Sequence, residues 1–201
     1  MPRLRLRYNA PVTLSFAIVA AALLGADQLT GGALIGAWFT APPYLDVRSV
    51  NSWLRLFSHV LGHASWAHLV SNLSFILLIG PVLEEKFGSG LVFVMMIVTA
   101  GVTGALNALV VHAGLLGASG IAFMLILLSS FTNIRSGEIP LTLLLVIALY
   151  LVREFVAALT PDSVSQLTHI AGGLCGGLFG FVFARREPRA PAVPKDGPPP
   201  R

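Results

Sequence analysis

The sequence predicts an all-α integral membrane protein, a bundle of six transmembrane helices. Of its 201 residues, 55% are hydrophobic and 11% are charged, whereas a soluble domain carries about 25% charged residues. The apolar residues also gather in six segments whose lengths approach the roughly 20 residues that a helix needs to cross a bilayer. A soluble enzyme presents a mixed, charged surface to water. This chain lacks the charges to build one, so its outer surface is expected to face lipid.

The six spans are expected at residues 12–29, 66–83, 91–111, 119–134, 139–159 and 167–184. The first apolar run is longer than the core of a signal peptide, and no small-residue cleavage site ends it, so we interpret it as a retained span. Residues 1–11 form an N-terminal segment in this division of the chain. The tail 185–201 is rich in Pro and Arg and is expected to be disordered.

The basic residues indicate the orientation of the chain in the membrane. Six spans place both termini on the same side. If that side is the cytoplasm, ten Lys and Arg residues lie inside and three lie outside, which is the bias that the positive-inside rule describes. Most of these basic residues cluster at the two ends of the chain rather than along one face, which also argues against a nucleic-acid-binding surface. We therefore expect both termini in the cytoplasm, and a short chain of this kind fits a bacterial plasma membrane.

The connection 30–65 is the longest between two predicted spans, and it is expected on the outer side. It contains Trp38, Tyr44 and Trp53 among many apolar residues, so it is too apolar for a solvated loop. Aromatic side chains favour the headgroup region of a bilayer. We expect an amphipathic element that is partly embedded in the membrane.

Polar side chains inside spans are costly, and they are usually functional or paired. Four of them fall at one expected depth, just below the outer surface. His68 and Asn72 lie near the outer end of the second span and, four residues apart, share one helix face. Ser119 begins the fourth span and His169 begins the sixth. Three helices therefore present polar groups at the same level.

Ser119 stands between Gly117 and Gly120 at the junction of an outer loop and a helix. Glycines let the backbone turn sharply and approach a substrate closely. A helix N-terminus carries unsatisfied amide N–H groups and a positive partial charge, which suit the stabilisation of an oxyanion. The alternative is close packing of small residues, with Ser119 as a helix N-cap.

His169 is followed by Gly172, Gly176 and Gly180, which lie on one helical face with it. Such a face lets a neighbouring backbone pack closely. If that neighbour is the fourth span, His169 can serve Ser119 as the base that a serine nucleophile requires. His68 and Asn72 can both donate hydrogen bonds. The alternative is that these polar residues only connect helices.

Several short motifs follow one another along the chain: Arg55-Leu56-Phe57-Ser58-His59, His63, His68-x-x-x-Asn72, Gly117-x-Ser119-Gly120 and His169-x-x-Gly172-x-x-x-Gly176. A further segment, Glu84-Glu85-Lys86-Phe87-Gly88-Ser89-Gly90, stands at the inner turn after the second span. Taken in this order, the motifs resemble the rhomboid family of intramembrane serine proteases. The resemblance covers the chain from about residue 11 to residue 183.

The resemblance implies a six-helix bundle with a water-filled cavity open to the outer face. Ser119 would be the nucleophile and His169 the general base, in a dyad without an acidic third member. His68, Asn72 and the Ser119 amide would form the oxyanion site, and neither a cofactor nor a metal would be needed. The substrates would be single-span membrane proteins, cut near the outer end of their span. The fifth helix and the loop 160–166 would gate or cover the site.

Two departures from the family pattern concern aromatic residues. Members often carry Tyr four residues after the nucleophile, where the ring packs on the catalytic histidine. Here that residue is Phe123, which keeps the ring and loses the hydroxyl. Trp53 is separated from Arg55 by one residue, whereas the family commonly has the two adjacent. Both departures are expected to shift rate or substrate preference and to leave the mechanism intact.

The chain lacks the motifs of other intramembrane proteases. A zinc protease needs His-Glu-x-x-His, and the His59 to His63 segment has the spacing with Val60 in place of the base. We interpret these histidines as shaping the loop and the outer cavity. A Ser–Lys protease needs a lysine near its serine, but Lys86 is expected on the inner side, far from Ser119. Lys86 and Glu84 are interpreted as charges at the cytoplasmic edge.

Two non-enzyme alternatives remain. The first is an inactive rhomboid-like protein that binds membrane helices without cleaving them; loss of Ser119 or His169 would mark it, and both are present. The second is a small transporter or channel subunit, which the absence of an internal repeat disfavours. The sequence sets no oligomeric state and names no physiological substrate.

Overall fold

The computed structural model describes residues 8–131, 141, 144–145, 148–149, 152 and 166–183. The predicted fifth span, the tail 185–201 and residues 1–7 lie wholly or largely outside these residues. The described part contains helices and one isolated bridge between Ala41 and Leu115, and it contains no β-strand. In chain order the helices are α1 (Pro11–Leu29), α2 (Ala33–Trp38), α3 (Val50–Ser58), the 3-10 turn η1 (His59–Leu61), α4 (Trp66–Phe87), α5 (Ser89–Leu106), the π turn η2 (Asn107–Val111), α6 (Ser119–Phe131) and α8 (Gln166–Phe183).

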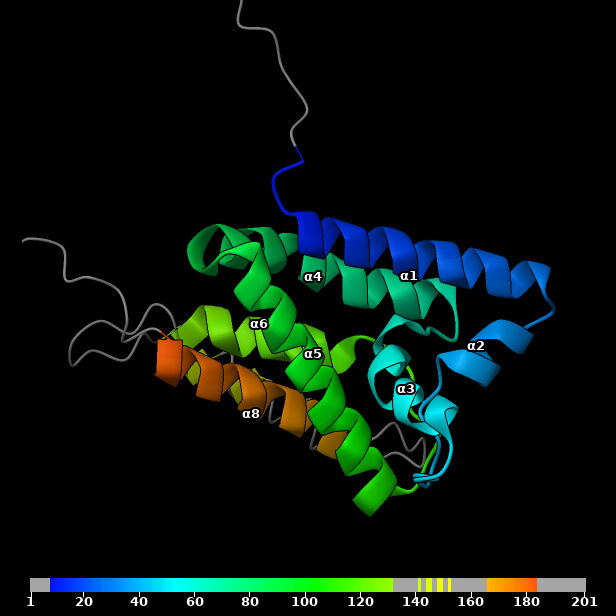
Figure 1. The fold of residues 1–201 in the computed structure, drawn as a ribbon. Helices are drawn as coiled ribbons and strands as arrows, with labels where there is room; N and C mark the ends of the chain where they lie inside the picture. Colours follow the sequence, from blue (N-terminus) through cyan, green and yellow to red (C-terminus); the bar gives the residue numbers. More distant parts are fainter. Residues whose placement is uncertain are drawn as a thin grey trace, which may run out of the picture.

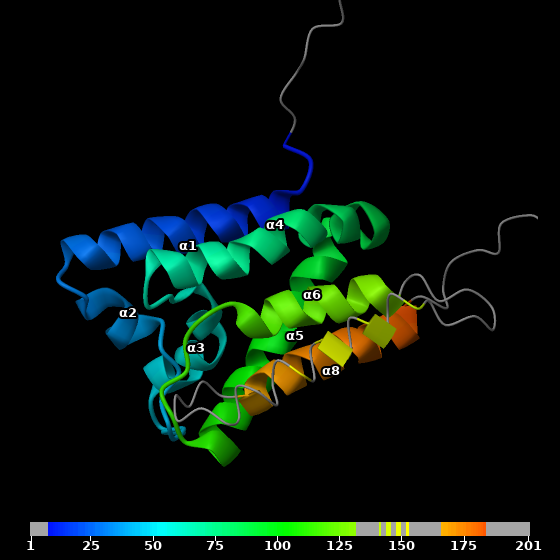
Figure 2. The same ribbon diagram turned by 180° about the vertical axis from the view of Figure 1, so that it is seen from behind.

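The long helices form a bundle, and the short helices gather at one end of it (Figure 1). Helix α1 runs antiparallel to α4, and α6 runs beside α8 in the same direction (Figures 1 and 2). Helices α2 and α3 lie at the end where α6 and α8 begin. The start of α1 and the end of α8 lie toward the opposite end of the bundle. The predicted site residues on α4, α6 and α8 therefore share one end of the fold.

Within the part of the chain that the structure describes, four helices are long and apolar enough to cross a membrane. They are α1, α4, α8 and the continuous stretch of α5 with η2, Ser89–Val111. Each coincides with a predicted span, although α4 runs four residues beyond the expected end at Leu83. Helix α6 is described over 13 residues, from the predicted start of the fourth span. The total of six spans stays a prediction.

Glu84, which the sequence indicates as an edge charge, has a buried carboxylate with partners in α1. Its side chain is 4% exposed, and its carboxylate accepts hydrogen bonds from the amides of Val12 and Thr13 at 3.2 and 2.6 Å and from the Thr13 hydroxyl. The first amides of a helix have no partner within the helix, and a negative charge there is favourable. Pro11 fits the start of α1 because it has no amide hydrogen. Glu84 on α4 thus caps α1.

The connection 30–65 folds into α2, α3 and η1 rather than a loop. Ser49 caps α3 by accepting the amide of Ser52 at 3.3 Å. Arg55 donates to the carbonyls of Thr40 at 2.5 Å and Gly36 at 3.2 Å, which ties α3 to the end of α2. The apolar side chains of Trp53, Leu54 and Phe57 gather on one face of α3 and are 46%, 54% and 42% exposed. The polar residues Asn51, Arg55 and Ser58 lie on the opposite face. Helix α3 is therefore amphipathic, as the sequence predicts.

The core lies around α6. Its residues Ile121, Met124, Leu125 and Leu128 are all at most 1% exposed, and they pack with buried residues of α4 and α5. Between helices in a bilayer, the close packing of such side chains contributes the stabilisation, because lipid is as apolar as the core. Because α6 is fixed on several sides, its N-terminal residue Ser119 has a defined place in the fold.

Candidate active site at the start of helix α6

Ser119 is the first residue of α6, and the turn before it is pinned by the η1 region. The amide of Gly117 donates to the His59 carbonyl at 3.0 Å. Gly117 has φ +116°, in a region that favours glycine, and a methyl group there would lie 2.7 Å from the His68 ring. Only glycine allows this close approach. The turn therefore brings Ser119 beside the N-terminal end of α4.

His169 reaches Ser119 because α8 packs against α6 without intervening side chains. A methyl group on Gly172 would collide with the backbone of Gly120, and one on Gly176 would collide with the backbone of Met124. Small residues permit this backbone-to-backbone approach. As a result the Ser119 Oγ and His169 Nε2 atoms are 2.7 Å apart, a hydrogen-bond distance.

Phe123 lies one turn after Ser119 and holds the His169 ring. The two ring centroids are 5.1 Å apart, and the planes are tilted by 47°. Both side chains are 7% exposed. Aromatic pairs at this separation are favourable, so Phe123 restricts the orientation of the imidazole that faces Ser119. The contact that the sequence suggested for this position is present.

His68 and Asn72, both on α4, face the turn at Gly117 that precedes Ser119. Ser65 caps this helix by accepting the His68 amide at 3.1 Å, which fixes the first turn. The Asn72 side chain is 7% exposed, and its Nδ2 atom is buried with no hydrogen-bond partner among the described residues. A buried donor without an acceptor is costly, so it is poised to bind an acceptor that enters. A methyl group on Gly117 would lie 3.7 Å from that Nδ2 atom.

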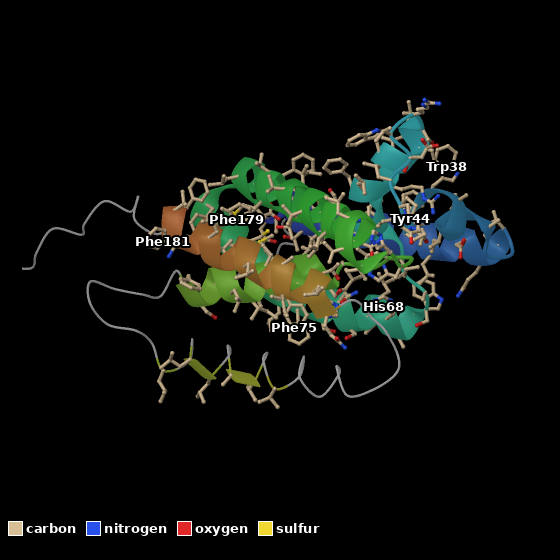
Figure 3. All side chains as sticks on the ribbon, turned by 90° about the horizontal axis from the view of Figure 1, so that it is seen from below. Trp38, Tyr44, His68, Phe75, Phe179 and Phe181 are labelled. Atoms are coloured by element: carbon tan, nitrogen blue, oxygen red, sulfur yellow. The ribbon has the colours of Figure 1, made fainter. Side chains whose placement is uncertain are left out.

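A small cavity of about 60 Å³ opens beside the dyad. Phe75 lies on the same face of the molecule as His68 (Figure 3), and it lines this cavity from α4. Its wall contains both polar and apolar side chains, those of Ser71, Asn72, Phe75, Ser119, Ala122, Phe123 and Ile126. A much larger apolar cavity of about 970 Å³ lies between α1, α3 and α5. None of the predicted catalytic or oxyanion side chains lines it, so the smaller cavity is the relevant one.

His59 and His63 lie behind the turn and are each 1% exposed. Burial lowers the pKa of both imidazoles from 6.5 to about 4, and hydrogen bonds from the rings to backbone carbonyls only partly oppose it. The His59 ring contacts the Leu56 carbonyl at 3.0 Å and the Thr103 hydroxyl at 3.4 Å. These histidines shape the loop, as the sequence indicates. Among the described residues no three His, Cys, Asp or Glu side chains converge as metal ligands do.

The structure thus brings together Ser119, His169, His68 and Asn72. It also places Gly117, Gly120, Gly172, Gly176 and Phe123 against them. Two contacts had no signal in the sequence. The Ala118 amide donates to the His63 Nε2 atom at 3.4 Å, and Glu84 caps α1. Both join residues that are more than 50 positions apart, which no local pattern predicts.

Comparison with known proteins gives the family. The model of the Rhomboid domain matches residues 50–186, more than half of the chain. The protein named Rhomboid protease GlpG from Yersinia pestis (strain Pestoides F) is 27% identical over 183 residues, which cover 89% of this chain and 65% of that protein. The protein of the same name from Haemophilus influenzae is 24% identical over 146 residues, 71% of this chain and 76% of that protein.

The chain spans about two thirds of the length of the Yersinia relative. The matched region contains the Ser119–His169 pair and the turn that holds it. Four described helices have the length and apolar character of membrane spans. The chain is an integral membrane protein and belongs to the rhomboid family.

Proposed function

We propose that this protein is an intramembrane serine protease in which Ser119 is the nucleophile and His169 the general base. The observation that carries the proposal is the 2.7 Å contact between the Ser119 Oγ and His169 Nε2 atoms. A serine hydroxyl is a weak nucleophile until an adjacent base accepts its proton. Related proteins of this family are named proteases, which supports the same chemistry.

The reaction follows from the positions of these groups. The Ser119 Oγ atom attacks a peptide carbonyl as His169 takes its proton, and a tetrahedral oxyanion forms. The His68 side chain, the Asn72 Nδ2 atom and the Ser119 amide are the proposed donors to that oxyanion. His169 then gives its proton to the leaving amine, and water hydrolyses the acyl-enzyme. The buried, unpartnered Nδ2 atom of Asn72 supports this role, because no protein acceptor competes for it among the described residues.

The proposed substrates are single-span membrane proteins, cut near the extracytoplasmic end of the span. The small cavity beside Ser119 lies between α4 and α6, and it is far too narrow for a helix about 10 Å across. A peptide bond within a helix is hydrogen-bonded and shielded. A substrate must therefore unwind locally before Ser119 can reach its carbonyl, which favours sequences with weak helix propensity at the cut.

We further propose that residues 12–184 form the membrane domain and that both termini lie in the cytoplasm. Basic residues concentrated at the two ends support this orientation. The test uses Cys175→Ser protein, since Cys175 is the only cysteine, with one cysteine introduced at Pro2 or at Asp46. A membrane-impermeant maleimide added to intact cells should label only the Asp46→Cys protein. Labelling of Pro2→Cys instead would reverse the topology.

The catalytic proposal is tested with a fluorophosphonate probe, which reacts with activated serines whatever the substrate. Wild-type protein should label, whereas Ser119→Ala and His169→Ala should not. Ser71→Ala is the matched control, because Ser71 lines the same cavity and has no proposed role; it should label like wild type. Cleavage of a single-span substrate should follow the same pattern. Labelling or cleavage retained by Ser119→Ala refutes the proposal, and inert wild-type protein favours the helix-binding alternative.

A further inference from the structure

His63 lies between η1 and α4 and has no part in the chemistry described above. The chain just before it is tightly held, because a methyl group on Gly62 would collide with the Phe39 backbone carbonyl. The His63 side chain is 1% exposed. A buried imidazole in a fixed segment has few orientations available, so its hydrogen bonds define a specific local structure.

The two ring nitrogens of His63 meet groups of opposite kind. The Nδ1 atom lies 3.2 Å from the Leu61 carbonyl, which can only accept a hydrogen bond. The Nε2 atom lies 3.4 Å from the amide nitrogen of Ala118, which can only donate. Both contacts are satisfied by one form of the ring, the neutral tautomer that carries its proton on Nδ1. Burial supports this form, since it lowers the pKa of His63 to about 4.

The Ala118 contact bears directly on the oxyanion site. Three successive amides, those of Gly117, Ala118 and Ser119, precede or begin α6. The first donates to the His59 carbonyl at 3.0 Å and the second to His63. No described residue accepts a hydrogen bond from the third. The turn is therefore oriented so that the Ser119 amide is the one left for a substrate oxygen.

The same ring also contacts the side-chain donor on α4. The ring centroids of His63 and His68 are 5.1 Å apart at an interplanar angle of 67°. This edge-on contact is a favourable aromatic geometry. His63 therefore touches both halves of the proposed oxyanion site, the backbone turn before Ser119 and the imidazole of His68.

We propose that His63, as the neutral Nδ1–H tautomer, is a positioning residue that holds the Ala118 amide and the His68 ring, and thereby directs the Ser119 amide and the His68 side chain at the same point. This inference rests on the proposed serine-protease function. It assigns no proton transfer to His63. Errors of about 1 Å in the placement of catalytic groups can cost about 10²-fold in rate, so loss of His63 should act on kcat and leave KM nearly unchanged.

The test compares two substitutions of His63. His63→Leu removes the acceptor for the Ala118 amide and should lower kcat by about 10- to 100-fold. His63→Gln places a carbonyl oxygen near the former Nε2 position and should restore kcat to within a few-fold of wild type. Full kcat in folded His63→Leu protein overturns the proposal, as does a His63→Gln protein that folds and remains as slow as His63→Leu.

His59→Leu is the matched control, because His59 is equally buried and its ring bonds Leu56 and Thr103 instead of the turn. The backbone carbonyl that accepts the Gly117 amide stays in this variant. Its unfolding midpoint should fall like that of His63→Leu, with kcat per folded molecule within about threefold of wild type. Equal losses of kcat in the two variants would assign His63 a structural role only.

Two readouts do not depend on activity. Nitrogen NMR of the wild-type imidazoles should show His63 neutral with its proton on Nδ1 at pH 7, and hydrogen exchange at the Ala118 amide should accelerate in His63→Leu but not in His59→Leu. A protonated ring, the other tautomer or unchanged exchange overturns the inference. If these signals are as expected while wild-type protein neither labels nor cleaves, the proposed function fails and the His63–Ala118 contact stands.

Discussion

Gly172 of α8 lies against the backbone of Gly120 of α6, so closely that even a methyl group on Gly172 would collide with the Gly120 carbonyl. These two residues are neighbours of the dyad in the chain, since Gly120 follows Ser119 and Gly172 is three positions after His169. The helix spacing that they set is therefore the spacing that gives the 2.7 Å contact between the Ser119 and His169 side chains. The packing of α8 on α6 and the Ser119–His169 contact therefore depend on the same glycines.

Gly172→Ala should abolish labelling of Ser119 by the fluorophosphonate probe. The added methyl group must push α8 away from α6, which lengthens the Ser119–His169 contact beyond hydrogen-bonding distance. Overpacking of this kind also costs about 1–3 kcal/mol of stability. Labelling rates and unfolding in mixed micelles measure the two effects.

Gly177→Ala on the same helix is the control for that substitution. Its methyl group would meet the edge of the Phe131 ring at 3.3 Å, a side chain that can shift. Replacing glycine by alanine in a helix favours the helix by about 0.5–1 kcal/mol, so stability should change little and labelling should persist. Similar losses in the two variants would show that the Gly172 effect is not specific to the dyad.

Phe123→Leu should lower kcat by roughly 2- to 10-fold, because an aromatic contact of about 0.5–1.5 kcal/mol no longer holds the His169 ring in its productive orientation. Phe179→Leu is the control. It removes a ring that lies on α8 about 15 Å beyond His169 and packs on the core. It is expected to lower stability and leave kcat per folded molecule unchanged. Steady-state cleavage rates test both expectations. A Phe123→Leu protein with the kcat of wild type would contradict the proposed role of the Phe123 ring.

Glu84→Ala should destabilise the protein by about 2–4 kcal/mol, because the amides of Val12 and Thr13 lose their only described side-chain acceptor. Thr13→Val should cost about 1 kcal/mol, and the double variant should cost less than the sum, since the two residues share a hydrogen bond. Glu85→Ala is the control, as Glu85 is exposed beside Glu84. Additive losses for Glu84 and Thr13 would contradict the cap.

Acid should destabilise the fold between pH 6.5 and pH 4. His59 and His63 have ordinary values of 6.5 in the unfolded chain and a pKa of about 4 in the folded protein, so the unfolded state binds more protons in this interval. Their neutral forms favour folding fully above pH 6.5, and that contribution is lost as the pH falls toward 4. Unfolding midpoints measured across this range provide the test.

His59→Gln should flatten this pH dependence, because one of the two titrating groups is removed. A wild-type midpoint that stays constant from pH 7 to pH 4.5 would show that neither buried histidine is neutral in the folded state.

Much of the site follows from the sequence, because polar residues are few in an apolar chain. Ser119, His169, His68 and Asn72 stand out in apolar segments, and the glycine series after His169 marks a face for close packing. The structure brings all four together. The contact by which Glu84 caps α1 has no signal in the sequence, where a charge near a span end is expected to reach the interface. The partner of Glu84, Thr13, lies 71 positions away on a helix whose packing no local pattern reveals.

The sequence by itself determined the membrane setting, the helical class and the chemical groups available for catalysis, because hydropathy, charge and residue type are local properties of the chain. The tertiary structure alone decided which groups meet. The Ser119–His169 and His63–Ala118 contacts join residues 50 and 55 positions apart. Their distances depend on how closely α6, α8 and the η1 turn approach one another, which side-chain volume and backbone conformation set in three dimensions.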